Sequence, residues 1–293
     1  MEALIDLVYT SNYIELTGSN LDVTTKLCCK IFKNEKVAAR IEPESTEYTQ
    51  ARDALASLGR PNSFDDVIRS RREIINHAQA IMYAIDNVIW RRIPIDESLL
   101  KAVHKRLCLG DVLEEDAGRP CGYRQYRTWE IAVQHGRDMK EKSFFVRAST
   151  VARYMSDLAR DLQEDMYRAS KGEIDNPYDM ACRYSHRFFC IHPFGDGNGK
   201  MCRIILNILL LLYTRTISTF GGTDDEREEY LDITRRGNDA FRKEDMEVEE
   251  EEKLGHEELR RLTSRKSRPV APGTRVRFRY GDETERSRHG LYI

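Results

Sequence analysis

Residues 191–204 read IHPFGDGNGKMCRI, a polar stretch set between two apolar runs with helical spacing. The alternate glycines from Gly195 to Gly199 let the backbone approach a ligand closely, and the helix that follows presents unpaired amides at its positive end. Lys200 and Arg203 lie three residues apart, on one helical face, where they can neutralise phosphate oxygens. The stretch therefore predicts an anion site between two helices.

The same loop carries a base and an acid of the type that binds metal. His192 can take up a proton at neutral pH without perturbation. Asp196 supplies the hard oxygen that Mg²⁺ prefers when phosphates and water provide its other ligands. A glycine-rich turn with a buried histidine is the plainer interpretation, but it does not explain why a base, an acid and two cations accompany the glycines. The combination favours phosphate chemistry.

This stretch resembles the signature of the Fic family, HPFx[D/E]GNGRxxR, as HPFGDGNGK followed by Arg203. The resemblance implies a mainly α fold, a Fic-type helical bundle with a small β-hairpin flap. It also implies an AMP transferase (an AMPylator) with ATP as co-substrate and Mg²⁺ as cofactor. In that reaction His192 deprotonates a Ser, Thr or Tyr hydroxyl of a target protein, whose oxygen attacks the α-phosphorus of ATP. Removal of AMP, with water as nucleophile, is a second expected activity.

The resemblance also assigns roles within the loop. Phe194 anchors it in the core, and Asp196 holds Mg²⁺ on the α- and β-phosphates. The phosphate contacts fall at the start of the second helix, on Gly197, Asn198, Gly199, Lys200 and Arg203. Arg203 matches the arginine that holds the γ-phosphate. Lys200 stands where the family has its first arginine and lacks the planar fork, so lower activity or another nucleotide preference is expected.

Two further matches lie outside the loop. Residues 126–131, YRTWEI, resemble the family's flap, in which Thr128, Trp129 and Ile131 would dock the target segment by strand pairing. Residues 122–124, GYR, offer a competing register. Tyr230 and Asn238 resemble the helix beside the nucleoside, although ordinary core packing explains them equally well.

An inhibitory motif is expected near the N-terminus. Ser11 to Glu15, SNYIE, resembles the family pattern [S/T]xxxE[G/N], with Leu16 in place of the usual Gly or Asn. A Glu15 carboxylate that reached Arg203 would occupy the cation meant for the γ-phosphate and would repel the triphosphate. The alternative is that Glu15 is only a polar residue on a short amphipathic helix.

The remaining sequence divides into four parts. We expect two short helices in residues 1–33 and a surface loop or linker in residues 34–62. The catalytic domain is expected to span residues 63–243, and residues 244–293 form a charged extension with the composition of a solvated tail. Within the extension, Val276, Phe278 and Tyr280 alternate with arginines as in a half-exposed strand. Three N-caps are expected, at Ser63, Asp96 and Asn176, the last followed by a proline. A hairpin is expected between Gly122 and Phe145.

The composition narrows the possible partners. The chain has 293 residues, 40% of them hydrophobic, and a formal net charge of -2, so binding to nucleic acid or membranes is not expected. Its longest apolar run, Ile204 to Tyr213, is shorter than the ~20 residues of a membrane span. Seven cysteines without a CxxC pair favour reduced thiols in the cytoplasm or nucleus. The sequence is compatible with a homodimer. It is also compatible with a second function, that of a nucleotide-binding module that has lost the transfer activity.

Overall fold

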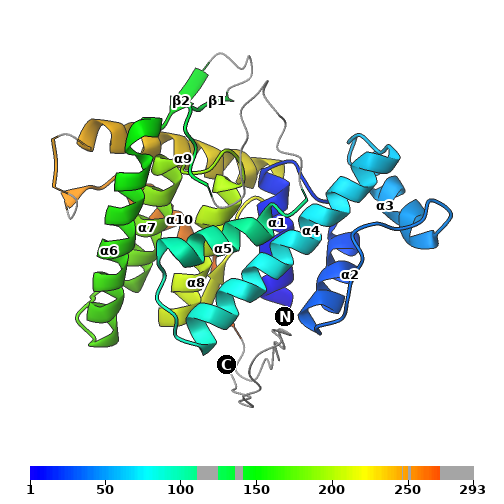
Figure 1. The fold of residues 1–293 in the computed structure, drawn as a ribbon, viewed down its shortest axis with the longest axis horizontal. Helices are drawn as coiled ribbons and strands as arrows, with labels where there is room; N and C mark the ends of the chain where they lie inside the picture. The colour runs from blue at the N-terminus through cyan, green and yellow to red at the C-terminus, as the bar shows by residue number, and fades with distance from the viewer. Residues whose placement is uncertain (111–124, 136–140, 246, 250–251, 271–293) are drawn as a thin grey trace.

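The computed structural model describes residues 1–110, 125–135, 141–245, 247–249 and 252–270. The described chain is mainly helical, with short strands that form two-stranded sheets (Figure 1). The α-helices are α1 (Glu2–Ile14), α2 (Leu21–Phe32), α3 (Thr46–Ser57), α4 (Phe64–Ile85), α5 (Glu97–Leu107), α6 (Val151–Ser170), α7 (Pro177–Ile191), α8 (Asn198–Tyr213), α9 (Asp224–Glu244) and α10 (Glu257–Lys266). A π-helix, η1 (Asp86–Trp90), extends α4, and a 3₁₀ turn, η2 (Ala148–Thr150), precedes α6. The strands are β1 (Ala132–His135), β2 (Glu141–Phe144), β3 (Thr216–Ser218) and β4 (Ser267–Pro269).

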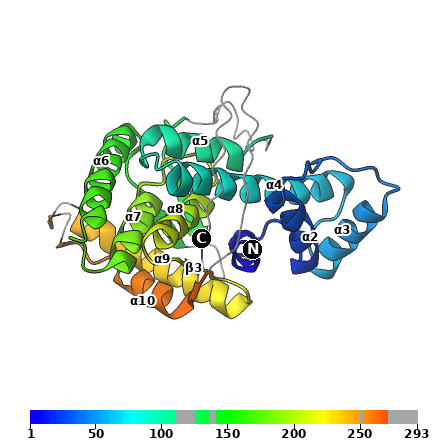
Figure 2. The ribbon, with the colours of Figure 1, turned by 90° about the horizontal axis from the view of Figure 1, so that it is seen from below.

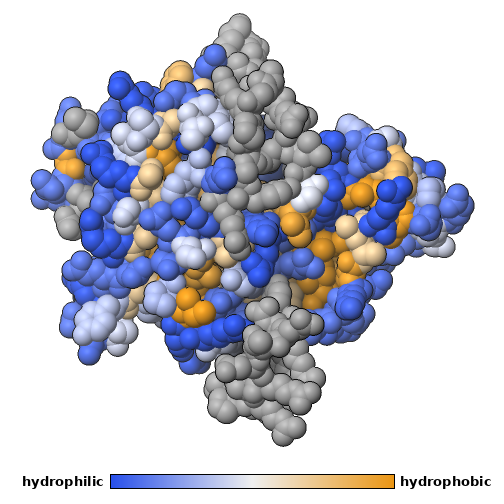
Figure 3. All heavy atoms as spheres, in the orientation of Figure 1, coloured by the Kyte–Doolittle hydropathy of each residue, from blue (hydrophilic) through white to orange (hydrophobic). Residues whose placement is uncertain are grey.

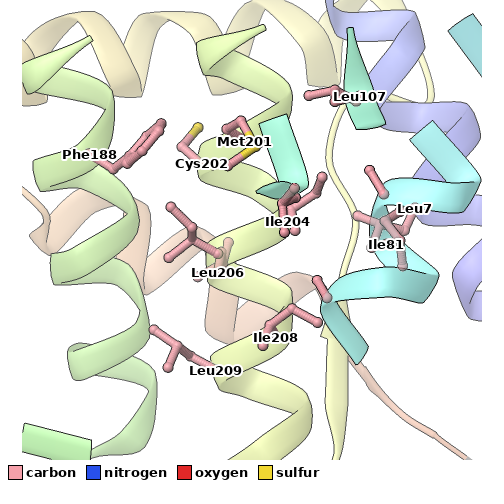
Figure 4. Packing of buried hydrophobic residues seen from close by; sticks show 14 of the residues in the cluster. Leu7, Ile81, Leu107, Phe188, Met201, Cys202, Ile204, Leu206, Ile208 and Leu209 are labelled. Carbon is pink, nitrogen blue, oxygen red and sulfur yellow. The ribbon is translucent and has the colours of Figure 1, made fainter. Parts of the chain in front are cut away.

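Helix α8 lies at the centre of the hydrophobic core. Its side chains from Met201 to Leu211 are buried on all sides, as expected of a helix that is apolar around its whole circumference. Phe188 of α7 faces it from one side, and Leu7 of α1 and Ile81 of α4 face it from the other (Figure 4). The N-terminal end of this buried helix is the end that carries the glycine-rich loop.

The three expected N-caps are confirmed. Ser63 accepts a hydrogen bond from the Asp66 N–H and forms a capping box with it, and Asp96 accepts from the Leu99 N–H at 2.7 Å. Asn176 accepts from the second and third helical amides of α7, with Pro177 at the first helical position. These caps fix where α4, α5 and α7 begin.

The prediction of a surface loop over residues 34–62 is wrong, because this segment contains α3. Ser45 caps the helix by accepting a hydrogen bond from the Tyr48 N–H. Ala51 and Leu55 pack on Val67 of α4 in a small cluster of their own. The apolar stripe of α3 is narrow and most of its other residues are polar, which is why the segment lacks a strong helical period. Seen from below, α2 and α3 lie at one end of the molecule, away from α6 (Figure 2).

The prediction of a solvated C-terminal tail is also wrong for part of the extension. Leu259 and Leu262 of α10 are 4% and 2% exposed and belong to the main core, so this helix is packed in place. After α10, strand β4 pairs antiparallel with β3, with Ile217 opposite Arg268. The predicted strand over residues 276–280 lies outside the described residues.

The hairpin is confirmed, but it starts later than the sequence suggests. Strands β1 and β2 pair antiparallel, with Ala132 opposite Phe144 and His135 opposite Glu141. Thr128, Trp129 and Ile131 therefore precede β1. The competing register at residues 122–124 lies outside the described residues.

Helix α1 packs on α4, α8 and α9 rather than standing apart from them. Leu7, Val8 and Ile14 are at most 2% exposed and join the main core. The Ile14 carbonyl accepts a hydrogen bond from Arg227 Nε at 2.8 Å, which ties the end of α1 to α9. A buried contact of 3.3 Å joins Asn12 Oδ1 of α1 to Nδ1 of His77 on α4. The C-terminal half of α1 is thus held from two directions.

Hydrophilic residues predominate on the face shown in Figure 3, with smaller hydrophobic patches between them. Within the part of the chain that the structure describes, no helix is long and apolar enough to cross a membrane.

Candidate active site

Two left-handed residues shape the loop between α7 and α8. His192 ends α7 with φ of 51°, a conformation that few non-glycine residues adopt, and Pro193 then prevents the helix from continuing. Gly197 precedes α8 with φ of 74°, which a residue without Cβ adopts at no steric cost. These two positions reverse the chain and place the first amides of α8 beside the end of α7.

The loop is fastened from inside by Phe194 and Asn198. Phe194 is fully buried and its ring stacks on that of His104 at 3.7 Å. Asn198 donates from Nδ2 to the Phe194 carbonyl at 2.8 Å and accepts from the Phe194 N–H at 3.0 Å. The core anchor expected of Phe194 is present, whereas the side chain of Asn198 is engaged within the loop rather than directed at a ligand.

Asp196 lies at the rim of this turn. Its Oδ1 accepts a hydrogen bond from the Gly197 N–H at 2.6 Å, and its backbone carbonyl accepts one from His104 Nε2 at 3.1 Å. Burial lowers the pKa of His104 to about 4, so this imidazole is neutral and donates through Nε2. The bond at Oδ1 leaves Oδ2 to coordinate a cation. One carboxylate beside the N-terminus of a helix fits Mg²⁺, which binds proteins through few carboxylates and takes its other ligands from phosphate and water.

His192 has the tautomer that a general base needs. Its Nδ1 lies 3.3 Å from the Phe189 carbonyl, which can only accept, so Nδ1 carries the proton and Nε2 keeps a free lone pair. The ring stacks on Phe145 at 3.8 Å. Burial lowers the pKa of His192 to about 4, and the positive charge of Arg127 contributes in the same direction. The imidazole is therefore neutral at physiological pH.

Arg203 is bound by the C-terminal half of α1. Its Nε donates to Ser11 Oγ at 2.7 Å, and its Nη2 donates to the Ser11 carbonyl at 3.1 Å and to Glu15 Oε1 at 2.5 Å. Burial opposes the charge on the guanidinium, but the attraction of Glu15 outweighs it and raises the pKa of Arg203. The structure thus brings together Ser11, Glu15 and Arg203, which are far apart in the sequence.

Glu15 occupies the position of an anion at the start of α8. A Cβ built on Gly199 would come within 2.3 Å of Glu15 Oε1, so the carboxylate lies directly on the first turn of the helix. Its side chain is 36% exposed, yet burial still acts against its charge. The attraction of Arg203, followed by that of Lys200, lowers the pKa of the carboxyl all the same. A helix N-terminus favours such a charge.

Lys200 also has a carboxylate partner. Its Nζ lies 3.4 Å from Oε2 of Glu73 on α4, and both side chains are largely buried. Each of the two cations predicted to hold phosphate is therefore paired with a glutamate in this structure.

The flap residues lie on the outer side of the loop. Thr128 is exposed, and Trp129 and Ile131 are half-buried. They are linked to His192 through the fully buried side chain of Arg127, which donates to the carbonyls of His192 at 2.8 Å and Trp129 at 2.9 Å.

Tyr230 and Asn238 are both buried on α9. Tyr230 stacks on Phe220 with ring centres 5.0 Å apart, and the Arg203 guanidinium lies over its ring. Asn238 donates from Nδ2 to the Phe144 carbonyl at 2.9 Å, which links α9 to β2, and no described atom pairs with its Oδ1. Contact of either residue with a nucleoside stays a prediction.

Sequence reasoning missed Arg127, His104 and Glu73 as residues of the site. Arg127 falls within the flap motif, but nothing in the sequence marks it as a buried hub. His104 and Glu73 belong to amphipathic helices that precede the loop by many residues, so only the fold reveals their proximity.

The solved structure of a Fic domain containing signaling protein from Bacteroides thetaiotaomicron has a similar fold. The alignment covers 90% of this chain and 93% of that one, with a TM-score of 0.56 and 16% identity. The chain therefore has the mainly helical Fic fold with small two-stranded sheets. Residues 94–210, which include the whole of the loop, match the Fic/DOC family. The chain carries a Fic/DOC family domain.

Two distant relatives are named as protein adenylyltransferases. The protein adenylyltransferase and cysteine protease IbpA of Histophilus somni is 23% identical over 198 residues, which are 65% of this chain and 4% of that protein. The protein adenylyltransferase fic-1 of Caenorhabditis elegans is 24% identical over 145 residues, 49% of this chain and 25% of that protein. The chain thus spans a small part of the length of these relatives.

Proposed function

We propose that the chain is a protein adenylyltransferase, which transfers AMP from ATP to a Ser, Thr or Tyr hydroxyl of another protein. The observation that carries this proposal is the arrangement at the loop. A neutral His192 with a free Nε2 lies beside a helix N-terminus that accepts an anion, with Lys200 and Arg203 on its first turns. A base next to a polyphosphate site is what attack by a hydroxyl on phosphorus requires.

The chemical step follows from these positions. Nε2 of His192 takes the proton of the hydroxyl, and the hydroxyl oxygen forms a bond to the α-phosphorus. The bond between that phosphorus and the oxygen bridging to the β-phosphate breaks, and pyrophosphate leaves. Asp196 would hold Mg²⁺, which when bound neutralises charge on the phosphates. The amides of Gly197 and Gly199 and the cation of Arg203 hold the rest of the triphosphate.

The contact between Glu15 and Arg203 supports a regulated enzyme. In this proposal residues 63–243 form the catalytic unit, and residues 1–33 supply Ser11 and Glu15 to its phosphate site. The carboxylate takes the guanidinium that a γ-phosphate needs, and an ATP molecule bound beside it would have its α-phosphate turned out of line. The bound glutamate is then an inhibitory contact, and its release starts transfer. Removal of AMP with water as nucleophile is a further activity of the same site.

The second candidate is a nucleotide-binding module without transfer. Lys200 favours it, because the family arginine is missing and the lysine is already paired with Glu73. The retained His192 and Asp196 favour the enzyme, since binding alone needs no base.

One experiment separates the two candidates. The chain, its Glu15→Gly variant and the double variant Glu15→Gly/His192→Ala are incubated with Mg²⁺ and ATP labelled at the α-phosphate in a cell extract. Transfer predicts label on protein with Glu15→Gly and none with the double variant. Equal nucleotide binding by all three, with no labelled protein in any of them, would leave the binding module.

A further inference from the structure

Glu73 makes contacts in two directions from the middle of α4. Its Oε2 lies 3.4 Å from Lys200 Nζ at the start of α8 and also accepts a hydrogen bond from the Gly18 N–H at 3.3 Å. The side chains of Glu73 and Lys200 are 14% and 12% exposed, so water screens this ion pair only in part. The glutamate connects the phosphate loop to the turn that follows α1.

We propose that Glu73 is a positioning residue that sets how tightly the chain holds a polyphosphate, because it competes with phosphate oxygens for Lys200. This inference rests on the proposed function in taking ATP as the nucleotide. An ammonium is a compact charge, and a phosphate oxygen that approaches it must replace the carboxylate already there or share the cation with it. The competition lowers affinity for every ligand that reaches Lys200 and leaves other ligands unaffected.

The Glu73 contact is separate from the Glu15 contact. Glu15 comes from α1 and pairs with Arg203, whereas Glu73 comes from α4 and pairs with Lys200. Removal of the Glu15 carboxylate therefore frees one cation and leaves the other occupied. The two glutamates are connected through the turn after α1, because Gly18 follows Glu15 by three residues and its N–H donates to Glu73. The Gly18 carbonyl in turn accepts a hydrogen bond from Ser70 Oγ of α4 at 2.7 Å.

The test measures binding rather than transfer. Calorimetry in the Glu15→Gly/His192→Ala background, where nothing turns over, gives Kd for MgATP, tripolyphosphate and adenosine, with and without Glu73→Gln. The amide keeps the size of the side chain and loses its charge. We expect Kd for MgATP and tripolyphosphate to fall about fivefold, equivalent to about 1 kcal/mol, and Kd for adenosine to stay unchanged. Glu164→Gln, on the exposed face of α6, removes the same charge far from the loop and should change none of the three.

A second variant guards against a merely structural effect. Lys200→Met should weaken MgATP binding, and Glu73→Gln added to it should give a clearly smaller gain, because the cation for which Glu73 competes is gone and only the repulsion between its charge and the phosphates is relieved. Glu73→Asp keeps the charge on a shorter side chain and should give a smaller gain than Glu73→Gln. Unchanged or weaker tripolyphosphate binding in folded Glu73→Gln would overturn the proposal, as would an equal gain for adenosine.

Failure of this inference can be told apart from failure of the proposed function. If Glu15→Gly transfers AMP and Glu73→Gln leaves polyphosphate binding unchanged, only the role of Glu73 is wrong. If Glu73→Gln tightens polyphosphate binding and Glu15→Gly labels no protein, the role of Glu73 stands and the transferase is wrong.

Discussion

The carboxylate of Glu15 lies on Gly199 so closely that a methyl group at Gly199 would stand 2.3 Å from Oε1. This contact places a fixed negative charge on the first turn of α8, 2.5 Å from the Arg203 guanidinium. An anion site at a helix N-terminus is thus already filled by the chain itself. In the proposed function, the geometry that would attract a phosphate also holds the glutamate, so that nucleotide binding and inhibition would share one site.

Removal of the Glu15 carboxylate should activate the enzyme. Glu15→Gly frees Arg203 for the γ-phosphate, and AMP transfer and self-modification should rise at least about tenfold, equivalent to roughly 1.4 kcal/mol of barrier. The measurement is the initial rate of label incorporation at saturating ATP and Mg²⁺. The gain should vanish when His192 is also replaced by Ala. An unchanged rate would mean that α1 is only structural.

Gly199→Ala tests the same contact from the other side. Gly199 has ordinary helical φ, so alanine suits the backbone and should by itself stabilise the helix by up to ~1 kcal/mol. In the unmodified chain the methyl group meets Oε1 of Glu15, and we expect a lower Tm. In the Glu15→Gly background the clash is absent and Tm should rise. Thermal melts of the four proteins complete this cycle, and additive shifts would show that the two residues do not touch in solution.

The loop between α7 and α8 and most helices could be predicted because their signals are local. The N-cap residues Ser63, Asp96 and Asn176 each mark the start of a helix. The residues of the loop motif are contiguous in the sequence, so the motif can be read directly. The ring of contacts around the loop could not be predicted, because Glu73 and Arg127 act through long-range packing that leaves no local pattern.

The errors also have physical causes. Helix α3 buries only Ala51, Ala54 and Leu55, too few to show a helical period among the polar residues around them. Helix α10 is highly charged, and its buried face consists of Leu259, Leu262 and Thr263. The composition of both segments is dominated by the polar residues of their solvent-facing sides, so it gave no sign of the side that packs on the core.

His192 should behave as a general base with a low pKa. His192→Ala should abolish labelling and leave the Kd for ATP largely unchanged. Because the folded pKa is about 4, below the usual value, the neutral base is present at neutral pH and is lost only as pH falls through about 4. The transfer rate of Glu15→Gly should therefore stay level from about pH 8 to about pH 6 and decline only in more acidic buffer. A midpoint near 6.5, with folding verified by circular dichroism, would contradict the lowered pKa of this imidazole.

Lys200→Arg should raise transfer or tighten ATP. The guanidinium can donate to two phosphate oxygens at once, whereas the ammonium acts as a point charge. Steady-state kinetics with varied ATP would show the change as a lower KM or a higher kcat. A slower arginine variant would mean that the lysine has a role of its own, and the phosphate contact assigned to it would be withdrawn.

Arg127 should be needed to position His192 and the flap together. Its side chain is fully buried, and Nη2 donates to the carbonyls of Val146 and Ile191 in addition to the bonds at His192 and Trp129. Arg127→Met leaves these acceptors without their donors, at a cost of ~1–3 kcal/mol for each buried group that water does not reach. We expect a lower Tm and, in the Glu15→Gly background, a kcat reduced at least about tenfold. Arg127→Lys restores a charged donor for one or two carbonyls and should recover part of the Tm but less of the kcat, since a single ammonium cannot hold both sides of the loop.

The pH profile of the transfer rate distinguishes a positioning role of Arg127 from simple destabilisation. The Arg127 charge lowers the pKa of His192, so Arg127→Met should move the acidic limb of the transfer rate to higher pH, whereas Arg127→Lys should move it less. An unaltered limb in a folded Arg127→Met variant, with full kcat, would reduce Arg127 to a packing residue.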